Sequence, residues 1–118
     1  MTTEPLDETA LGRLRELDPD GRHGVLLRVL TAFETSLTRA LGQLQEPQTG
    51  SDAKLVAGLA HTLKSSSASV GALALSAACA QVEARLRAGQ TAALRDDVDL
   101  LLVHGRAALR AVGAMLRS

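Results

Sequence analysis

The chain has 118 residues, and 46% of them are apolar, mostly Ala, Leu and Val, with one Phe and no Trp or Tyr. This length fits a single domain with one core, and the composition favours close-packed helices over strands. Thirteen basic and thirteen acidic residues cancel, so neither net charge nor aromatic platforms support a nucleic-acid-binding function.

The first predicted elements are a short helix and a long one. The short helix is rich in leucine and ends near residues 18–21, where Asp-Pro-Asp-Gly is a strong stop signal. The long amphipathic helix extends from about residue 22 to residue 45. Its apolar residues follow steps of three and four: Leu26, Leu30, Phe33, Leu37, Leu41 and Leu44.

The third predicted helix follows an interruption at residues 47–50, which read Pro-Gln-Thr-Gly. Ser51 or Asp52 can cap this helix, which runs to about Val70, and Gly71 suits the turn after it. A helical wheel with about 100° per residue predicts its buried sector. That sector contains Leu55, Leu59, Leu63, Ser66 and Val70.

Two more predicted helices complete the chain. The first runs from about residue 73 to residue 88, and Gly89 closes it. Thr91 can cap the second, which also has Gly105 on its apolar stripe, at a cost of about 1 kcal/mol in helix propensity. The other stripe residues are Leu94, Val98, Leu101, Leu102, Leu109, Val112 and Leu116.

Short connections make sequential helices antiparallel. We therefore predict an all-α fold, an antiparallel up-down four-helix bundle with a short additional N-terminal helix packed against one end. The bundle is expected to form one domain over residues 1–118, with no internal repeat or flexible linker.

Several classes of site and location are disfavoured. Glu4, Asp7 and Glu8 near the N-terminus do not suit a signal peptide, and no segment approaches the roughly 18 uncharged residues of a membrane span. A cytoplasmic protein without direct membrane insertion is therefore expected. The single cysteine, Cys79, excludes an internal disulfide. Its place on an apolar stripe with Leu75, Val82 and Leu86 predicts a buried thiol.

His61 is the main candidate for chemistry. It lies about 180° from the centre of the apolar sector of the third helix, so its imidazole is expected to be exposed. Its neighbours at helical spacing are small or basic: Ala57, Gly58, Lys64, Ser65 and Ala68. A neutral imidazole is a nucleophile, and small neighbours let a partner's surface approach it closely.

The residues around His61 suit a phosphoryl group. Its transfer spreads negative charge over oxygen atoms, which Lys64, one helical turn from His61, can stabilise. Ser65 can bond a phosphate oxygen or simply leave room for a partner. Ser66 and Ser67 are expected to turn towards the core and bond the carbonyls four residues earlier. They are not expected to be nucleophiles, because the serines and His61 lie on different helix faces.

The sequence His61-Thr62-Leu63-Lys64, followed by small residues and Gly71, resembles the signature of histidine-containing phosphotransfer (HPt) domains. In that family the histidine, a lysine three residues later and a glycine ten residues later occur on the second long helix of a four-helix bundle. The resemblance implies that His61 is phosphorylated and that Lys64 is the phosphate-side cation. It also implies that the small neighbours of His61, Ala57, Gly58, Ser65 and Ala68, receive a receiver domain. Many members have glycine where this chain has Ser65, which is still small.

The resemblance also implies a polar residue, often glutamine, that orients the histidine ring from the neighbouring helix. An ungapped register places Glu83 there. Its carboxylate could accept a hydrogen bond from the ring nitrogen that does not react and so fix the tautomer. Arg87, one turn further, is a candidate contact of the phosphate or the partner. A solvated charge on a helix face is an equally good interpretation of both residues.

The function implied is that of a phosphorelay carrier. His61 would accept a phosphoryl group from a response-regulator receiver aspartate and pass it to another receiver, in a pathway that includes a hybrid sensor histidine kinase. A carrier of this kind is expected to be a monomer. It is not expected to be an enzyme, because the chain lacks a glycine-rich nucleotide loop. It is expected to need no cofactor, with Mg²⁺ supplied by the receiver. A free-standing protein and a domain of a larger hybrid kinase both fit.

Two other functions are compatible with parts of the sequence. A helical adaptor could bind a receiver or a kinase without being phosphorylated, although the presence of His61 argues against it. The dimerising helical domain of a sensor kinase usually has an acidic residue after its histidine and a proline further on, whereas this chain has Thr62 and no proline after Pro47. His23 and His104 are weaker candidates for chemistry, and no metal-ligand spacing joins any two histidines, so no metal site is predicted.

Overall fold

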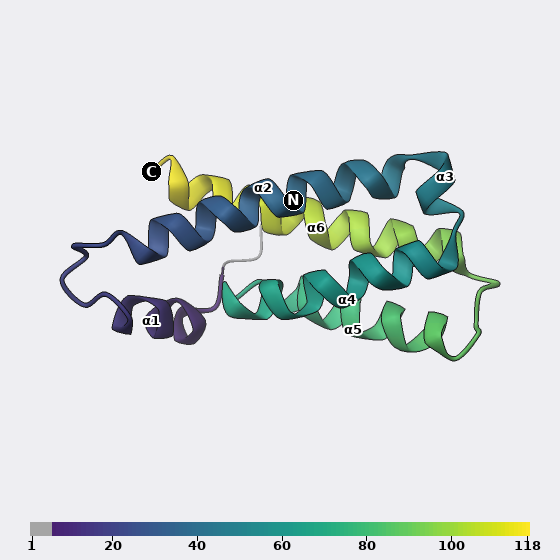
Figure 1. Ribbon diagram of the computed structural model, residues 1–118, viewed down its shortest axis with the longest axis horizontal. Helices are drawn as coiled ribbons and strands as arrows, with labels where there is room; N and C mark the ends of the chain where they lie inside the picture. The colour runs from purple at the N-terminus through teal and green to yellow at the C-terminus, as the bar shows by residue number, and fades with distance from the viewer. Residues whose placement is uncertain (1–5) are drawn as a thin grey trace.

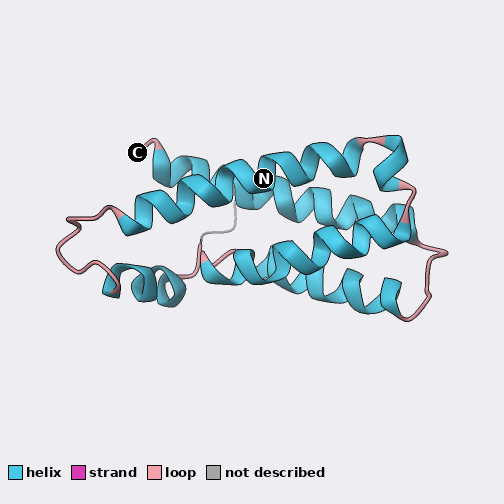
Figure 2. Cartoon of the chain, in the orientation of Figure 1, coloured by secondary structure: helices cyan, strands magenta, loops and turns pink. Residues whose placement is uncertain are grey.

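The computed structural model describes residues 6–118, and within that range every regular element is a helix (Figure 2). The predicted all-α class is thereby confirmed, whereas Glu4 and the other residues of 1–5 lie outside the described part. The helices are, in chain order, α1 (Glu8–Glu16), α2 (Val25–Gln45), α3 (Pro47–Gly50), α4 (Ala53–Ser69), α5 (Leu73–Arg87) and α6 (Leu94–Leu116).

Four long helices, α2, α4, α5 and α6, run side by side as an antiparallel bundle (Figure 1). The most extensive contact is between α4 and α5, and α2 packs mainly against α6. Contacts of α5 with α6 and of α2 with α4 complete the bundle. The short helix α1 lies at one end, below the start of α2, and touches both α2 and α4. This is the arrangement predicted for the N-terminal helix.

Aspartate side chains accept hydrogen bonds from backbone amides at the starts of α2 and α4. The Asp52 carboxylate accepts hydrogen bonds from two backbone amides of the first turn of α4, at 3.0 and 3.2 Å, so one of the two predicted caps is confirmed. α2 begins after Gly24, which has no side chain to offer. The buried Asp18 carboxylate instead reaches back to the amides of His23, at 3.1 Å, and Val25, at 3.2 Å. These contacts lower the pKa of Asp18.

Two helix boundaries differ from the prediction. Residues 47–50 form α3, a single helical turn, where the sequence predicted only an interruption; Pro47 is its first residue, a position that suits the fixed φ of proline. The prediction that Thr91 caps the last helix is wrong, because α6 begins only at Leu94 and has no side-chain cap. Asp96 and Asp97 place negative charge in its first turn instead, which favours a helix N-terminus.

The buried face of α4 is rotated from the predicted one towards α5. Leu55 was expected in the core, but half of its surface is exposed (50%). The rotated face carries several small side chains, which let α5 pack closely against α4 and bury apolar surface between the two helices. His61 therefore lies near the α4–α5 interface and not directly opposite the core. The residues that α4 buries are Val56, Ala57, Ala60, Leu63 and Ser67.

Other core positions follow the sequence more closely. Cys79 is fully buried, as predicted, and burial raises the pKa of its thiol to about 12. Gly105 is buried where α6 crosses α2, and a Cβ there would lie 2.5 Å from Leu41 Cδ2. The Ser66 hydroxyl donates to the Thr62 carbonyl, at 3.4 Å, as predicted. The Ser67 hydroxyl is buried and has no hydrogen-bond partner among the described residues, so that part of the prediction is wrong.

Gly71 ends α4 and also joins α1 to the bundle. Its φ of +82° lies in the left-handed region that only glycine adopts easily. The Asp7 amide donates a hydrogen bond to the Gly71 carbonyl at 2.9 Å. A Cβ on Gly71 would lie 2.5 Å from the Asp7 backbone nitrogen, so a second, steric constraint requires glycine here.

We expect Gly71→Ala to destabilise the bundle more than Gly89→Ala. Gly89 has nearly the same φ, +80°, but open space around its Cα, so its replacement should cost only the backbone strain, about 1–2 kcal/mol. Gly71→Ala adds a clash with backbone atoms and should cost on the order of 3 kcal/mol or more. Urea unfolding of the two variants measures both losses. If both variants lost the same free energy of unfolding, the close contact of Gly71 with Asp7 would make no contribution to stability.

Candidate functional site

His61 lies midway along α4, and 62% of its side-chain surface is exposed. Its exposure is as predicted, but its ring is also anchored. Nδ1 lies 2.7 Å from Glu83 Oε2 on α5. An ionised carboxylate only accepts hydrogen bonds, so Nδ1 carries the hydrogen and donates it. In the neutral ring that has its hydrogen on Nδ1, the other nitrogen, Nε2, keeps a free lone pair, which is the nucleophilic form of a histidine nitrogen.

Glu83 is the centre of the site. Only 9% of its side chain is exposed, and its carboxylate accepts hydrogen bonds from three groups. Lys64 Nζ donates to Oε1 at 2.7 Å, while His61 Nδ1, at 2.7 Å, and Arg87 Nε, at 3.0 Å, both donate to Oε2. The Lys64 bond, helped by those of His61 and Arg87, lowers the pKa of Glu83 to about 2 although burial opposes the shift. Glu83 is therefore ionised at neutral pH.

Helical spacing brings these side chains together. His61 and Lys64 are three residues apart on α4, and Glu83 and Arg87 are four apart on α5, so each pair shares a helix face. The structure thus unites four residues that the sequence had singled out. It also adds Ser76, which sequence reasoning missed: its hydroxyl donates to the Lys64 carbonyl at 2.9 Å and ties α5 to α4. The available signal was its spacing of seven residues, two helical turns, from Glu83.

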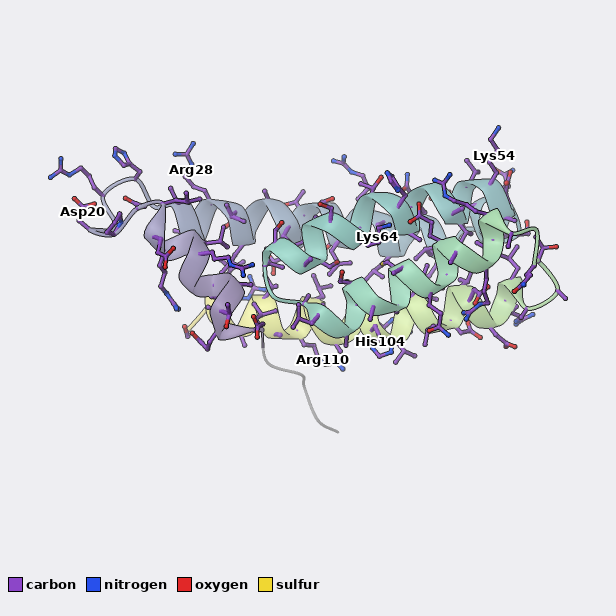
Figure 3. The ribbon with its side chains drawn as sticks, turned by 90° about the horizontal axis from the view of Figure 1, so that it is seen from below. Asp20, Arg28, Lys54, Lys64, His104 and Arg110 are labelled. Atoms are coloured by element: carbon purple, nitrogen blue, oxygen red, sulfur yellow. The ribbon has the colours of Figure 1, made fainter. Side chains whose placement is uncertain are left out.

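A hollow lies between α4 and α5, next to His61 on its N-terminal side. Two cations, Lys54 and Arg87, flank it above a small apolar floor. Figure 3 shows Lys54 extending into solvent near the start of α4, with Lys64 further along the same helix. The residues that line the hollow are Ala53, Lys54, Ala57, Gly58, Leu86 and Arg87.

The small residues around His61 are not equally accessible. Gly58, Ser65 and Ala68 are exposed, as expected for a docking surface. Ala57 was expected beside them, but it is buried, with 8% of its surface exposed, because the rotation of α4 turns it towards α5. It can meet a partner only as part of the floor of the hollow.

The site carries more positive than negative charge. Lys64 and Arg87 bring two positive charges and Glu83 one negative charge, so these three groups together carry one positive charge. This balance favours an anion close to Nε2. His23 and His104 are elsewhere: His23 precedes α2, and His104 is on α6, well separated from Lys64 in Figure 3. Within residues 6–118, no group of three or more His, Cys, Asp or Glu side chains is placed to hold a metal ion.

Comparison with known proteins decides the family. The model of the Hpt domain matches residues 28–116, about three quarters of the chain. The chain belongs to the Hpt domain family. Histidine phosphotransfer in phosphorelay signalling is therefore its function, with receiver domains and kinases as its classes of partner.

The fold of this Hpt domain is shared with a solved structure, histidine-containing phosphotransfer protein B (HptB) from Pseudomonas aeruginosa PAO1. The TM-score is 0.80, and the match covers 98% of this chain and 97% of that chain at 20% sequence identity. A comparison with curated proteins finds no match. In the part of the Hpt domain that the structure describes, no helix is long and apolar enough to cross a membrane.

We expect Glu83 to make the stability of the Hpt domain depend on pH in acid. Its pKa in the folded chain is about 2, below the ordinary value of 4.5. A lowered pKa means that the stabilisation is complete above about pH 4.5 and is lost as the pH falls towards 2. The parental protein should therefore melt at a higher temperature than Glu83→Gln at neutral pH, and this gap should narrow below pH 4.5.

Thermal unfolding of both proteins from pH 7 to pH 2 tests this expectation. The other carboxylates titrate alike in both proteins, so the difference in melting temperature isolates Glu83. A gap that stayed constant down to the acid limit would contradict the ion pairs described for this carboxylate.

Proposed function

We propose that His61 is the phosphorylated residue of this Hpt domain and that Nε2 carries the phosphoryl group. The observation behind this proposal is the hydrogen bond of Nδ1 to Glu83, which leaves the Nε2 lone pair free on an exposed side chain. No base is needed to activate His61, because the tautomer already has its nucleophilic nitrogen unprotonated.

The transfer step follows from this tautomer. The Nε2 lone pair attacks the phosphorus of a receiver's aspartyl phosphate. The bond between phosphorus and the aspartyl oxygen breaks, and its electron pair stays on the receiver's carboxylate. In the reverse direction, an aspartate oxygen of a second receiver attacks phosphorus, and the electrons of the N–P bond return to Nε2. The chain thus acts as a carrier between two receivers.

Lys64 is proposed to stabilise the transferring phosphoryl group. At rest its ammonium group bonds to Glu83 Oε1 at 2.7 Å, yet 40% of its side chain is exposed. Three donor hydrogens and a flexible stem allow it to contact a phosphoryl oxygen as well. Arg87, which is 61% exposed, adds a second positive charge near the same anion.

We further propose that the partner completes the reaction centre. The receiver supplies Mg²⁺ and its acidic pocket, and a hybrid sensor kinase is the source of phosphoryl groups. The Hpt domain itself needs no cofactor and has no kinase activity. We propose that it works as a monomer in the cytoplasm. Exposed Gly58, Ser65 and Ala68 support a receiver docking closely over His61.

Phosphotransfer to His61→Gln tests the proposed role of His61. Candidate receivers labelled with ³²P are incubated with the parental protein and with this variant. The parental protein should become labelled, with a linkage labile in acid and stable in base, whereas the variant should take up no label, because the amide of glutamine is not a nucleophile. Equal labelling would contradict the proposal. His104→Gln is the matched control and should be labelled like the parental protein.

Ala68→Arg tests the docking surface. A long side chain at this exposed position should keep a receiver away from His61 and reduce phosphotransfer at least about tenfold, a loss of about 1.4 kcal/mol or more in transition-state stabilisation. Phosphorylation by the small donor phosphoramidate should change little, since Ala68 is two helical turns from His61 and a small donor needs little room. Unchanged receiver affinity, measured by titration calorimetry, would place the docking surface elsewhere. If the parental protein bound the receiver but His61 took up no label, the alternative function, a helical adaptor that is not phosphorylated, would be favoured.

A further inference from the structure

Glu83 faces a ring whose charge changes during the proposed reaction. The form of His61 that can attack phosphorus is neutral, with a hydrogen on Nδ1, which lies 2.7 Å from Glu83 Oε2, and a lone pair on Nε2. When Nε2 binds phosphorus, the lone pair is used and the ring becomes a cation, provided that Nδ1 keeps its hydrogen. The ring can then stay cationic, or release that hydrogen to solvent and become neutral. What lies against Nδ1 decides between the two forms.

We propose that Glu83 keeps the hydrogen on Nδ1 of His61 while Nε2 carries the phosphoryl group, so that transfer in either direction exchanges no proton with solvent. This inference rests on the proposed phosphorylation of His61. It assigns Glu83 a part in the chemistry beyond orienting the ring.

The geometry around Oε2 favours the cationic ring. Glu83 Oε2 lies 2.7 Å from Nδ1, which is the length of a hydrogen bond to an ionised acceptor. If Nδ1 lost its hydrogen, its lone pair would face a carboxylate oxygen at this distance, and the two would repel each other. Glu83 cannot adapt, because an ionised carboxylate has no hydrogen to donate. Its contacts with Lys64 and Arg87 also hold it in place.

The other charged groups near the ring do not reverse this preference. Lys64 and Arg87 disfavour a second cation nearby, but the contact of Nδ1 with Glu83 is direct and the phosphoryl group adds negative charge on the other side of the ring. Cys79, one turn before Glu83, is uncharged because its pKa is about 12. The buried aspartate of α6, Asp97, is paired with Arg85, and Arg117, which follows α6, is paired with Glu34.

The retained hydrogen matters for breaking the N–P bond. When a receiver aspartate or a water molecule attacks phosphorus, the electron pair of the N–P bond returns to Nε2. With the hydrogen on Nδ1, the leaving group is neutral imidazole in its starting tautomer, ready for another cycle. Without that hydrogen, the leaving group would be an imidazolate anion, which is a much poorer one. Glu83 therefore keeps phosphorylated His61 in its reactive form as the pH rises.

Glu83→Gln separates this role from simple positioning. Glutamine has nearly the same shape, and its amide can accept a hydrogen bond from Nδ1 or, after rotation, donate one to Nδ1. The variant thus satisfies both forms of the ring, whereas glutamate satisfies only the cationic one. A purely structural role would change how fast the phosphoryl group is lost, but not how that rate depends on pH.

The experiment uses phosphoramidate as the donor and water as the acceptor. The parental chain, Glu83→Gln and a control with an exposed carboxylate of α6 removed, Asp99→Asn, are phosphorylated, and hydrolysis is followed by ³¹P NMR between about pH 6 and about pH 9. Background from other histidines is subtracted with His61→Gln. We expect a nearly constant rate for the parental chain and for Asp99→Asn. For Glu83→Gln we expect a rate that falls by up to about tenfold per pH unit once its ring loses the hydrogen.

The outcomes distinguish the two proposals. If His61 is phosphorylated and all three proteins share one pH profile, the role of Glu83 is refuted while the phosphorylation of His61 stands. If His61 takes up no phosphoryl group, the proposed function fails, and this inference with it. A second measurement needs no variant: in the ¹⁵N-labelled, phosphorylated parental chain, the Nδ1 resonance should stay that of a protonated nitrogen at pH 9. A shift to the unprotonated position there would overturn the inference.

Discussion

The Glu83 carboxylate, almost buried between α4 and α5, is the group on which the site depends. Removing a carboxylate from water is costly unless hydrogen-bond donors replace the water. Here three donors do so, His61 and Lys64 from α4 and Arg87 from α5. The bonds of His61 and Lys64 join the two helices, and the bond of His61 also orients the imidazole and selects its tautomer. Stability and reactivity therefore share one carboxylate, and a change there alters both.

The packing of α4 against α5 explains how His61 is both exposed and anchored. Small side chains such as Ala57 and Ala60 on the buried face of α4 let α5 approach closely. The Ser76 hydroxyl adds a hydrogen bond to α4 at Lys64. On another face of α5, Arg85 Nε donates to Asp97 Oδ1 of α6 at 3.0 Å. With α5 held from both sides, Glu83 has a defined position from which to reach a ring that is otherwise open to solvent.

Much of the fold could be predicted because it depends on local patterns. Leucine spacing identified the long helices, and short connections implied their antiparallel order. The rotation of α4 was not predictable from hydrophobicity, because the helix buries Ala60 and Ser67 and leaves Leu55 half exposed. That choice depends on how closely a second helix can approach, which is a tertiary effect. Glu83 was placed by family resemblance, whereas its bond to Lys64 depends on the helix spacing that the sequence does not show.

The charges of the site have a further consequence for a carrier that must both receive and release. Before transfer, Lys64 and Arg87 outweigh Glu83 by one positive charge, enough to attract an anion without a strong permanent field. A phosphoryl group brings roughly two negative charges. In the proposed cationic form, His61 adds one positive charge at the same time, so that the phosphorylated site is close to neutral. A neutral product has no large electrostatic barrier to giving up its phosphoryl group. Without Glu83 the same site would hold two uncompensated cations, which would bind the phosphoryl group more firmly and disfavour the cationic ring. The carboxylate thus limits how tightly the carrier holds its cargo, as reversible transfer between two receivers requires.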